Sequence, residues 1–167
     1  MSTKIVSNSS PLIYLSKLGK LELLRKLFKE ILAPKEVFNE VVLRGKKEKF
    51  SEVLVIEDAM HEGWLKIRGT KVDRRLLKFA PELDLGETEV ISLARKVKAD
   101  LVLMDDASAR GVSESFGLNT KGTIYVLLKA YKSGLIKKEE VKILLDKLIL
   151  AGFRLSSEVY SRILEEL

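Results

Sequence analysis

Short apolar runs alternate with longer amphipathic stretches along this chain, and the alternation predicts an α/β protein. The runs with the character of strands are KIVS at 4–7, EILA at 30–33, LKIR at 65–68 and DLVLM at 100–104. The last of these is too apolar to expose either face, which is typical of a strand in a parallel sheet. We therefore expect a three-layer α/β/α sandwich around a mostly parallel central sheet.

Capping residues, prolines and glycines mark the ends of the predicted helices. In the first helix, Ser10 is the expected N-cap, Pro11 the first helical residue and Gly19 the terminator. Pro34 opens another helix, which the charged turn RGKKEK at 44–49 closes. The stretch that leads to residue 83 has weak periodicity. Further helices are expected at 21–28, 50–64, 82–99, 105–117 and 122–134.

The C-terminal end has the pattern of an α-helical hairpin. KKEEVKILLDKLILAG at 137–152 and SSEVYSRILEEL at 156–167 both have helical periodicity, and Gly152 marks the hinge between them. The length of 167 residues fits one domain over 1–167, with a core to about residue 134 and a helical extension over 135–167. We expect this extension to pack on the core or to exchange with a partner.

Composition narrows the possible chemistry. The chain has no cysteine, which excludes disulfides, thiolate zinc sites and a cysteine nucleophile, and its single His61 excludes a histidine-rich metal site. Lys and Arg number 30 against 24 acidic residues, and the net charge of +6 favours a polyanionic partner. With no leader sequence and no apolar run approaching ~18 residues, we expect a cytoplasmic protein without a membrane anchor. The abundance of Lys and Glu favours a heat-loving source.

Two carboxylates directly follow the apolar strand at 100–104. Ligands of open parallel sheets bind beyond the carboxyl ends of the strands, so Asn8 and Asp105 occupy the positions where chemistry is expected. Asp105 or Asp106 can instead cap the helix that follows, but only one of them can do so, and the other is left beside a like charge. A bound cation would relieve that repulsion.

The remaining candidate positions each have a structural alternative. Glu87 faces the apolar side of its helix near the helix start, but it also completes a capping-box pattern with Asp84. Glu40 lies at the edge of an apolar stripe and could pair with Arg44. The amide oxygen of Asn8 can coordinate a hard cation without adding charge, although asparagine also shapes helix starts and turns.

Five segments spread over most of the chain form a recognisable series. They are, in order, SNSSPLIYLSKLGKLELL (7–24), APKEVFNEVV (33–42), DLGETEVISLA (84–94), LVLMDDASAR (101–110) and GTIYVLLKAYKSGLI (122–136). Together they resemble the PIN-domain proteins, in the subgroup related to the toxin nucleases of bacterial and archaeal toxin–antitoxin pairs. The resemblance implies an α/β/α sandwich whose strand ends gather acidic residues around Mg²⁺ or Mn²⁺. It also implies RNA cleavage, which is the activity of most active members.

Roles follow from the resemblance position by position. The first-strand carboxylate of the family falls at Asn8, which is a departure because that position usually supplies the central ligand. The implied catalytic residues are Glu40, Glu87 and Asp105. The implied metal ligands are Asn8, Glu87, Asp105 and Asp106, with Glu89 as a support, and the residues implied to position water or phosphate are Ser10 and Thr123.

Hydrolysis of a phosphodiester needs a nucleophile made from water and a cation to absorb charge, which carboxylate-bound Mg²⁺ or Mn²⁺ provides without histidine. RNA contacts are expected from the basic run KIRGTKVDRRLLK at 66–78, whose structural alternative is a solvated lysine-rich face. Its expected RNA-binding residues are Arg68, Lys71, Arg74, Arg75 and Lys78.

Two alternatives to an active nuclease remain open. The neutral Asn8 supports a degenerate PIN-like protein that binds RNA or a protein partner without cutting. The apolar C-terminal hairpin also suits an interaction module that forms a homo-oligomer, such as a dimer, or holds an antitoxin segment. A receiver domain, which also has a carboxylate cup, is disfavoured because its paired acids follow the first strand.

Overall fold

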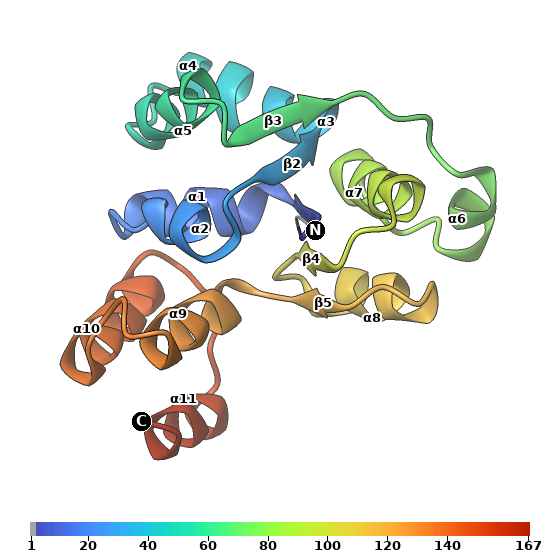
Figure 1. Ribbon diagram of the computed structural model, residues 1–167. Helices are drawn as coiled ribbons and strands as arrows, with labels where there is room; N and C mark the ends of the chain where they lie inside the picture. Colours follow the sequence, from blue (N-terminus) through green and yellow to red (C-terminus); the bar gives the residue numbers. More distant parts are fainter. Residues whose placement is uncertain (1–2) are drawn as a thin grey trace.

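The computed structural model describes residues 3–167 and has a five-stranded, all-parallel sheet at its centre (Figure 1). The strand order is β3-β2-β1-β4-β5, and each neighbouring pair is parallel. Val6 pairs with Leu32 on one side and with Val102 on the other. The strands are β1 Ile5–Ser7, β2 Ile31–Pro34, β3 Leu65–Arg68, β4 Leu101–Leu103 and β5 Thr120–Lys121.

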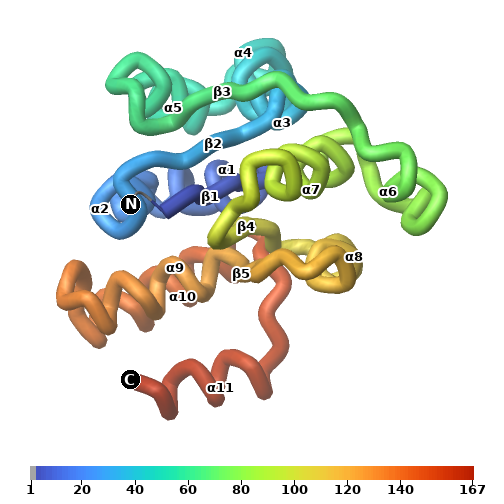
Figure 2. The backbone as a smooth tube through the Cα atoms, turned by 45° about the vertical axis from the view of Figure 1, so that its right-hand side comes forward, coloured from blue at the N-terminus to red at the C-terminus, as the bar shows by residue number. Residues whose placement is uncertain are grey.

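Helices cover both faces of this sheet, which confirms the predicted α/β/α sandwich (Figures 1 and 2). One face carries α7, with α6 and α8 beside it, and the other carries α1, α2, α5 and α9. The N-terminal helices are α1 Ser9–Lys17, α2 Glu22–Phe28, α3 Lys35–Phe38, the π-helix η1 Asn39–Arg44, α4 Gly45–Lys47 and α5 Glu52–His61. The later helices are α6 Arg74–Phe79, α7 Leu85–Val97, α8 Ala107–Ser115, α9 Thr123–Lys132, α10 Lys138–Leu150 and α11 Ser157–Glu165.

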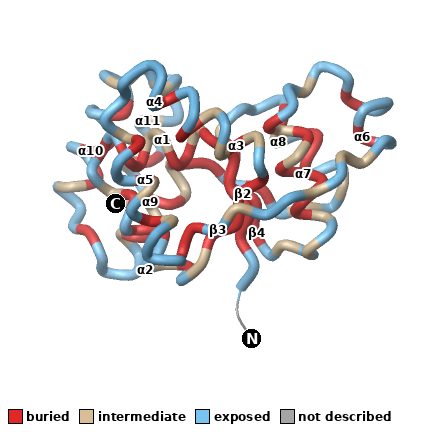
Figure 3. The backbone as a smooth tube through the Cα atoms, turned by 90° about the horizontal axis from the view of Figure 1, so that it is seen from above, coloured by how far each residue is buried: buried red, intermediate tan, exposed pale blue. Residues whose placement is uncertain are grey.

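The core lies along the central strands, where the buried stretches gather in Figure 3. Every residue of β1 and β4 is buried, including Ser7, as expected for parallel strands covered on both faces. The apolar stripe of α7, which includes Val90, Ile91 and Leu93, packs against β1, β2 and β4. This packing fixes the start of α7 beside the carboxyl ends of the strands.

Several predicted boundaries were wrong. The first helix begins at Ser9, and its N-cap is the extended residue Asn8 rather than Ser10. Pro11 is tolerated there because amide groups in the first turn have no intrahelical partner. The expected turn at 44–49 is helical as far as Lys47, since η1 continues directly into α4. The short elements β5 and α6 were missed because neither is long enough to show a period.

The C-terminal helices pack beside α9 and away from the sheet (Figure 2). The hydroxyl of Tyr131 donates to the Leu167 carbonyl at 2.9 Å, and that of Tyr160 donates to Asp146 at 2.7 Å, so α11 is attached to both α9 and α10. Gly152 has φ of +96°, which suits the turn after α10. Within residues 3–167, none of the helices has both the length and the apolar character needed to span a bilayer.

Candidate functional site

The carboxyl ends of β1 and β4 open into a cavity of about 500 Å³. Parallel strands end at the same edge of a sheet, and Ser7 pairs with Leu103, so Asn8 and Asp105 emerge side by side. Acidic side chains dominate the lining, which we call the carboxylate cavity. Its lining residues are Asn8, Ser9, Ser10, Ile13, Tyr14, Lys17, Glu40, Asp84, Glu87, Asp105, Asp106, Gly152, Phe153 and Arg154.

Asp105 is the most firmly held of the acids. Its Oδ1 accepts from the Thr123 amide at 2.7 Å, and its Oδ2 accepts from the hydroxyls of Thr123 at 2.7 Å and Ser10 at 2.6 Å. Thr123 is fully buried, and Gly122 passes so close that an added Cβ would lie 2.6 Å from Oδ1. Ser10 and Thr123 therefore orient this carboxylate, which joins β4 to the starts of α1 and α9.

Asp106 caps the next helix. Its Oδ1 accepts from the amide of Ala109 at 2.9 Å, as expected for the N-cap of α8. The sequence left open which of the two adjacent acids does this. The structure assigns the cap to Asp106 and turns Asp105 toward Ser10 and Thr123, although both acids line the carboxylate cavity.

Glu87 forms the capping box and also lines the cavity. The Asp84 amide donates to Glu87 Oε2 at 3.0 Å, and the Glu87 amide donates to Asp84 Oδ1 at 2.7 Å. Burial raises the pKa of Glu87, and the negative charges of Asp84, Asp106 and Glu40 raise it further, against the lowering effect of its hydrogen bond from Asp84. The two interpretations of this position, cap and site residue, are therefore compatible.

Glu40 enters the cavity from η1. Its Oε2 accepts from the Ser9 hydroxyl at 2.6 Å, and its Oε1 lies where a Cβ on Gly86 would come within 2.5 Å. Burial raises the pKa of Glu40, the hydrogen bond from Ser9 opposes this, and the charge of Asp84 adds to it. Within residues 3–167, Glu40 forms no ion pair with Arg44, so the structural alternative for this residue is not observed. A π-helical turn of this kind is frequent at functional sites.

Asn8 lines the cavity and is only 9% exposed. The backbone amide of Asn8 donates to the Leu103 carbonyl at 2.9 Å, which fixes the end of β1 against the end of β4. The side chain forms no capping hydrogen bond with α1. Its amide oxygen is thus available to the cavity.

The donor set of the cavity suits a hard divalent cation in kind. It consists of carboxylate, amide and hydroxyl oxygens, which are the ligands of Mg²⁺ and Mn²⁺. Among residues 3–167, however, no three His, Cys, Asp or Glu side chains gather closely enough to hold one ion. Glu40 Oε1 and Glu87 Oε1 accept no hydrogen bond in the described part of the chain. One carboxylate oxygen of each of these two side chains is therefore not engaged by the described residues.

Sequence reasoning missed part of the lining. Asp84 was considered only as a helix cap, although it also adds a carboxylate to the cavity. Lys17 and Arg154, which supply the positive charges of the lining, gave no signal because they approach the site only through the packing of α1 and the link after α10. Glu89, expected as a support, lies outside this lining and accepts from the Glu36 amide at 3.0 Å, at the start of α3.

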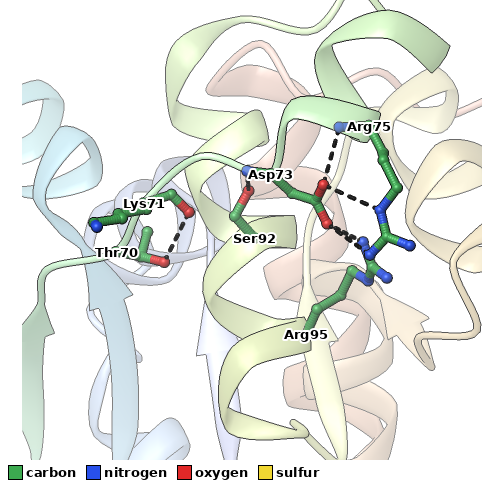
Figure 4. Close-up of polar contacts among 6 residues, drawn as sticks. All are labelled: Thr70, Lys71, Asp73, Arg75, Ser92 and Arg95. Atoms are coloured by element: carbon green, nitrogen blue, oxygen red, sulfur yellow. Dashed lines mark hydrogen bonds and ion pairs between the residues drawn. The ribbon is translucent and has the colours of Figure 1, made fainter.

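The predicted RNA-binding run does not line the carboxylate cavity either. Arg68 lies in a separate hollow at the amino ends of β1 and β2, while Arg74 and Lys78 are exposed on α6. Lys71 and Arg75 line a third hollow, between the loop at 69–73 and α7 (Figure 4). The run is therefore divided among different surfaces.

Comparisons with known proteins agree with this fold. A family model described as a PIN domain matches residues 4–167. Among solved structures, the chain is similar in fold to a PilT N-terminus domain protein from the hyperthermophilic archaeon Sulfolobus solfataricus, with a TM-score of 0.54 and 17% sequence identity. That match covers 77% of this chain and 93% of the other. No curated protein matches the sequence.

Proposed function

Because this chain belongs to the PIN-domain family, we propose that it is a metal-dependent ribonuclease that hydrolyses RNA phosphodiester bonds in the carboxylate cavity. PIN domains are generally metal-dependent nucleases. The observation that carries the proposal is the meeting of Asn8, Glu40, Glu87 and Asp105 at one cavity, although they come from four separate segments of the chain. Capping alone explains Asp106 and Asp84, but it does not explain Glu40.

The electrostatics of the cavity support a cation as its natural occupant. Five carboxylates line it, against the positive charges of Lys17 and Arg154. The pKa values of Glu40 and Glu87 are raised, by burial first and also by neighbouring acids, so ionising these groups costs more in the cavity than in water. A bound Mg²⁺ or Mn²⁺ would offset that cost, lower the pKa of bound water and absorb negative charge on the reacting phosphate.

Each side chain then has a distinct task. Asp105 is fixed by Ser10 and Thr123 and would be the rigid ligand, with Glu87 and the amide oxygen of Asn8 beside it. Glu40, held through Oε2 by Ser9, would orient a water molecule or accept its proton at Oε1. A raised pKa suits a carboxylate that accepts a proton near neutral pH. Lys17 and Arg154 would face the negatively charged phosphate.

The alternative is a PIN-domain protein that binds RNA or a protein without cutting. Two observations favour it. Asn8 brings no charge to the first-strand position, and all the oxygens of Asp105 are already engaged in hydrogen bonds. A site one charge poorer is expected to hold its cation more weakly, so a second metal ion is disfavoured.

Incubation of mixed-sequence RNA with the purified protein tests the proposal directly. We expect cleavage in millimolar MnCl₂ or MgCl₂, none in EDTA, and loss of cleavage in Glu40→Gln and Asp105→Asn. Glu139→Gln, an exposed acid in the first turn of α10, is the matched control and should cleave normally. RNA that is bound but left intact with every divalent metal would establish the non-catalytic alternative instead.

The partner proposals rest on α10. Its outer face exposes Ile143, Ile149 and Leu150, the last at 87%, which suits contact with a second copy or with an antitoxin segment. We propose a homodimer and a toxin–antitoxin role on this ground and on the family resemblance. Light scattering after size exclusion tests the dimer, because Leu150→Glu should shift a dimer to the monomer mass of 18.9 kDa. A wild-type protein already at that mass would overturn the dimer proposal.

A further inference from the structure

The hollow lined by Lys71 and Arg75, of about 590 Å³, lies between the loop at 69–73, the start of α6 and the outer side of α7. It is outside the carboxylate cavity and shares no lining residue with it. Its charged lining consists of four cations, Lys71, Arg75, Arg95 and Lys96, and the single acid Asp73. We propose that this hollow, the α6–α7 hollow, binds backbone phosphate groups of an RNA strand.

The arginines share one counterion (Figure 4). Asp73 Oδ1 accepts from the Arg75 amide at 2.9 Å and lies 3.5 Å from Arg75 Nε, while Asp73 Oδ2 lies 3.5 Å from Arg75 Nη2 and accepts from Arg95 Nη1. A single carboxylate neutralises only one guanidinium. Each guanidinium has five N–H donors, so several donors and a net positive charge remain for an anion.

Arg95 is held in place before any ligand arrives. Its guanidinium carbon lies 4.8 Å from the ring centre of Phe116, and Phe116 packs edge to face on Phe79 at 5.5 Å. The Asp73 amide donates to Ser92 Oγ at 3.0 Å, which fixes the carboxylate over α7. An arginine already immobilised by its neighbours loses little conformational entropy on binding phosphate, and this favours affinity.

The structural alternative is an ion-pair clamp that only ties α6 to α7. A clamp accounts for Asp73 with one arginine, but it does not account for Lys71 and Lys96, which form no ion pair within residues 3–167 and line the same hollow. The exposures also differ from those of a closed clamp: the Arg75 side chain is 76% exposed, while Arg95 is 26% exposed. The site therefore combines one largely covered and one solvent-exposed guanidinium.

The position of the hollow relates it to the carboxylate cavity. Helix α7 carries Glu87 near its start and Arg95 a little over two turns later, about 12 Å further along the helix axis. An RNA strand with one phosphate in the carboxylate cavity can therefore continue along α7 to the hollow. The inference rests on the proposed function only for the choice of RNA as the polyanion.

Asp73→Asn separates the two interpretations of this cluster. Asparagine keeps the N-cap acceptor for the Arg75 amide, but it removes the charge that Arg75 and Arg95 share. The probe is a fluorescent single-stranded 12-nucleotide RNA, with anisotropy measured in EDTA over a range of NaCl so that no cleavage takes place. If the hollow binds phosphate, Asp73→Asn should bind the RNA about threefold more tightly, and the salt dependence should steepen by about one phosphate contact.

The converse variant removes two lysines that would contact phosphate and that form no ion pair with the described residues. Lys71→Ala with Lys96→Ala should weaken binding by about tenfold and reduce the salt slope by about two contacts. The control is Lys142→Ala with Lys147→Ala on α10, which removes the same charge from exposed positions elsewhere and should leave the salt slope near the wild-type value, reduced by less than one contact. RNA binding at the wild-type level in both Asp73→Asn and the Lys71 and Lys96 double variant would overturn the inference. So would a lower stability of Asp73→Asn with unchanged RNA affinity.

Two further arms complete the experiment. Sodium phosphate, at a concentration equal to that of the RNA phosphate groups, should not displace the RNA. Displacement by sodium phosphate as effective as that by unlabelled RNA would indicate a site for a small phosphate ligand and overturn the proposal. The Mn²⁺ cleavage assay is read independently. RNA binding that depends on the hollow, without any cleavage, supports the hollow and rejects the ribonuclease, whereas cleavage with unaltered binding in the variants rejects the hollow alone.

Discussion

Removing the Asp105 side chain tests whether this residue is both a structural anchor and a site residue. Asp105→Ala leaves the amide and the hydroxyl of Thr123 without their acceptor in a position that is fully buried. An unsatisfied buried donor costs ~1–3 kcal/mol, and water entering from the adjoining cavity recovers part of that cost. Ser10 is half-buried and can bind water instead, so the loss of its hydrogen bond should add little to the cost in unfolding free energy. The expected loss in unfolding free energy is about 2–4 kcal/mol.

Asp105→Asn should behave differently. Its amide oxygen can still accept from the Thr123 amide, and the hydroxyls of Thr123 and Ser10 can turn to accept from the new amino group. We therefore expect a loss of about 1 kcal/mol or less in the asparagine variant, but complete loss of Mn²⁺-dependent cleavage in both variants. Charge and anchoring are separated in this way.

Urea unfolding followed by circular dichroism measures these differences, and in a chain of this length the loss in the alanine variant corresponds to roughly 5–15 °C in the melting temperature. Asp106→Asn is the matched control, because asparagine caps helices as well as aspartate does. An alanine variant at Asp105 with near wild-type stability would refute the role of its hydrogen bonds. An asparagine variant that still cleaves RNA would refute the need for its charge.

Three other outcomes follow from the geometry. Asn8→Asp should tighten Mn²⁺ binding in calorimetry several-fold, whereas unchanged affinity would separate this position from the metal. The raised pKa of Glu40 means that folding favours the protonated form of its carboxyl. The stability that this group contributes is present below the ordinary glutamate pKa and is lost as the pH rises through the raised value. Glu40→Gln should therefore melt at a higher temperature than wild type at pH 7–8 and show no such gain at pH 4. Equal melting shifts at both pH values would contradict this sign. Gly122→Ala should destabilise the fold because the new Cβ meets Asp105 Oδ1. Gly111→Ala, where the space is open, should be neutral or stabilising by up to about 1 kcal/mol in thermal melts. Similar shifts in the two variants would argue against the close approach of Gly122 to Asp105.

The sequence predicted those parts of the fold that have a period. β4 is an uninterrupted apolar run, β1 a short run within KIVS, and α7 has a clear stripe, so their presence and burial could be inferred before any coordinates. β5 has two residues and α6 has six, and neither is long enough to show alternation or a helical face. The place of β5 depends on its pairing with β4, which only the tertiary structure specifies, and α6 is too short after its cap at Asp73 for a helical face to appear.

The candidate site divides in the same way. Asn8 and Asp105 could be placed together because parallel strands share an edge, and Glu87 could be placed because its helix stripe is visible. The contacts of Ser10 with Asp105 cross between elements far apart in sequence, so its hydroxyl could be assigned to the site but not to a partner. Arg154 has no local pattern at all, since it reaches the cavity only through the turn after α10.

That turn has a consequence for control of the site. Phe153 packs edge to face on Tyr14 at 5.1 Å, so the link at 152–154 forms one side of the carboxylate cavity. The link between the last two helices thereby walls a site whose acids come from η1, the start of α7 and the end of β4. A molecule that pulled α10 and α11 away would admit bulk water, ease ionisation of Glu40 and remove the positive charge of Arg154. Displacement of the C-terminal hairpin alone would therefore change the ionic environment of the carboxylates.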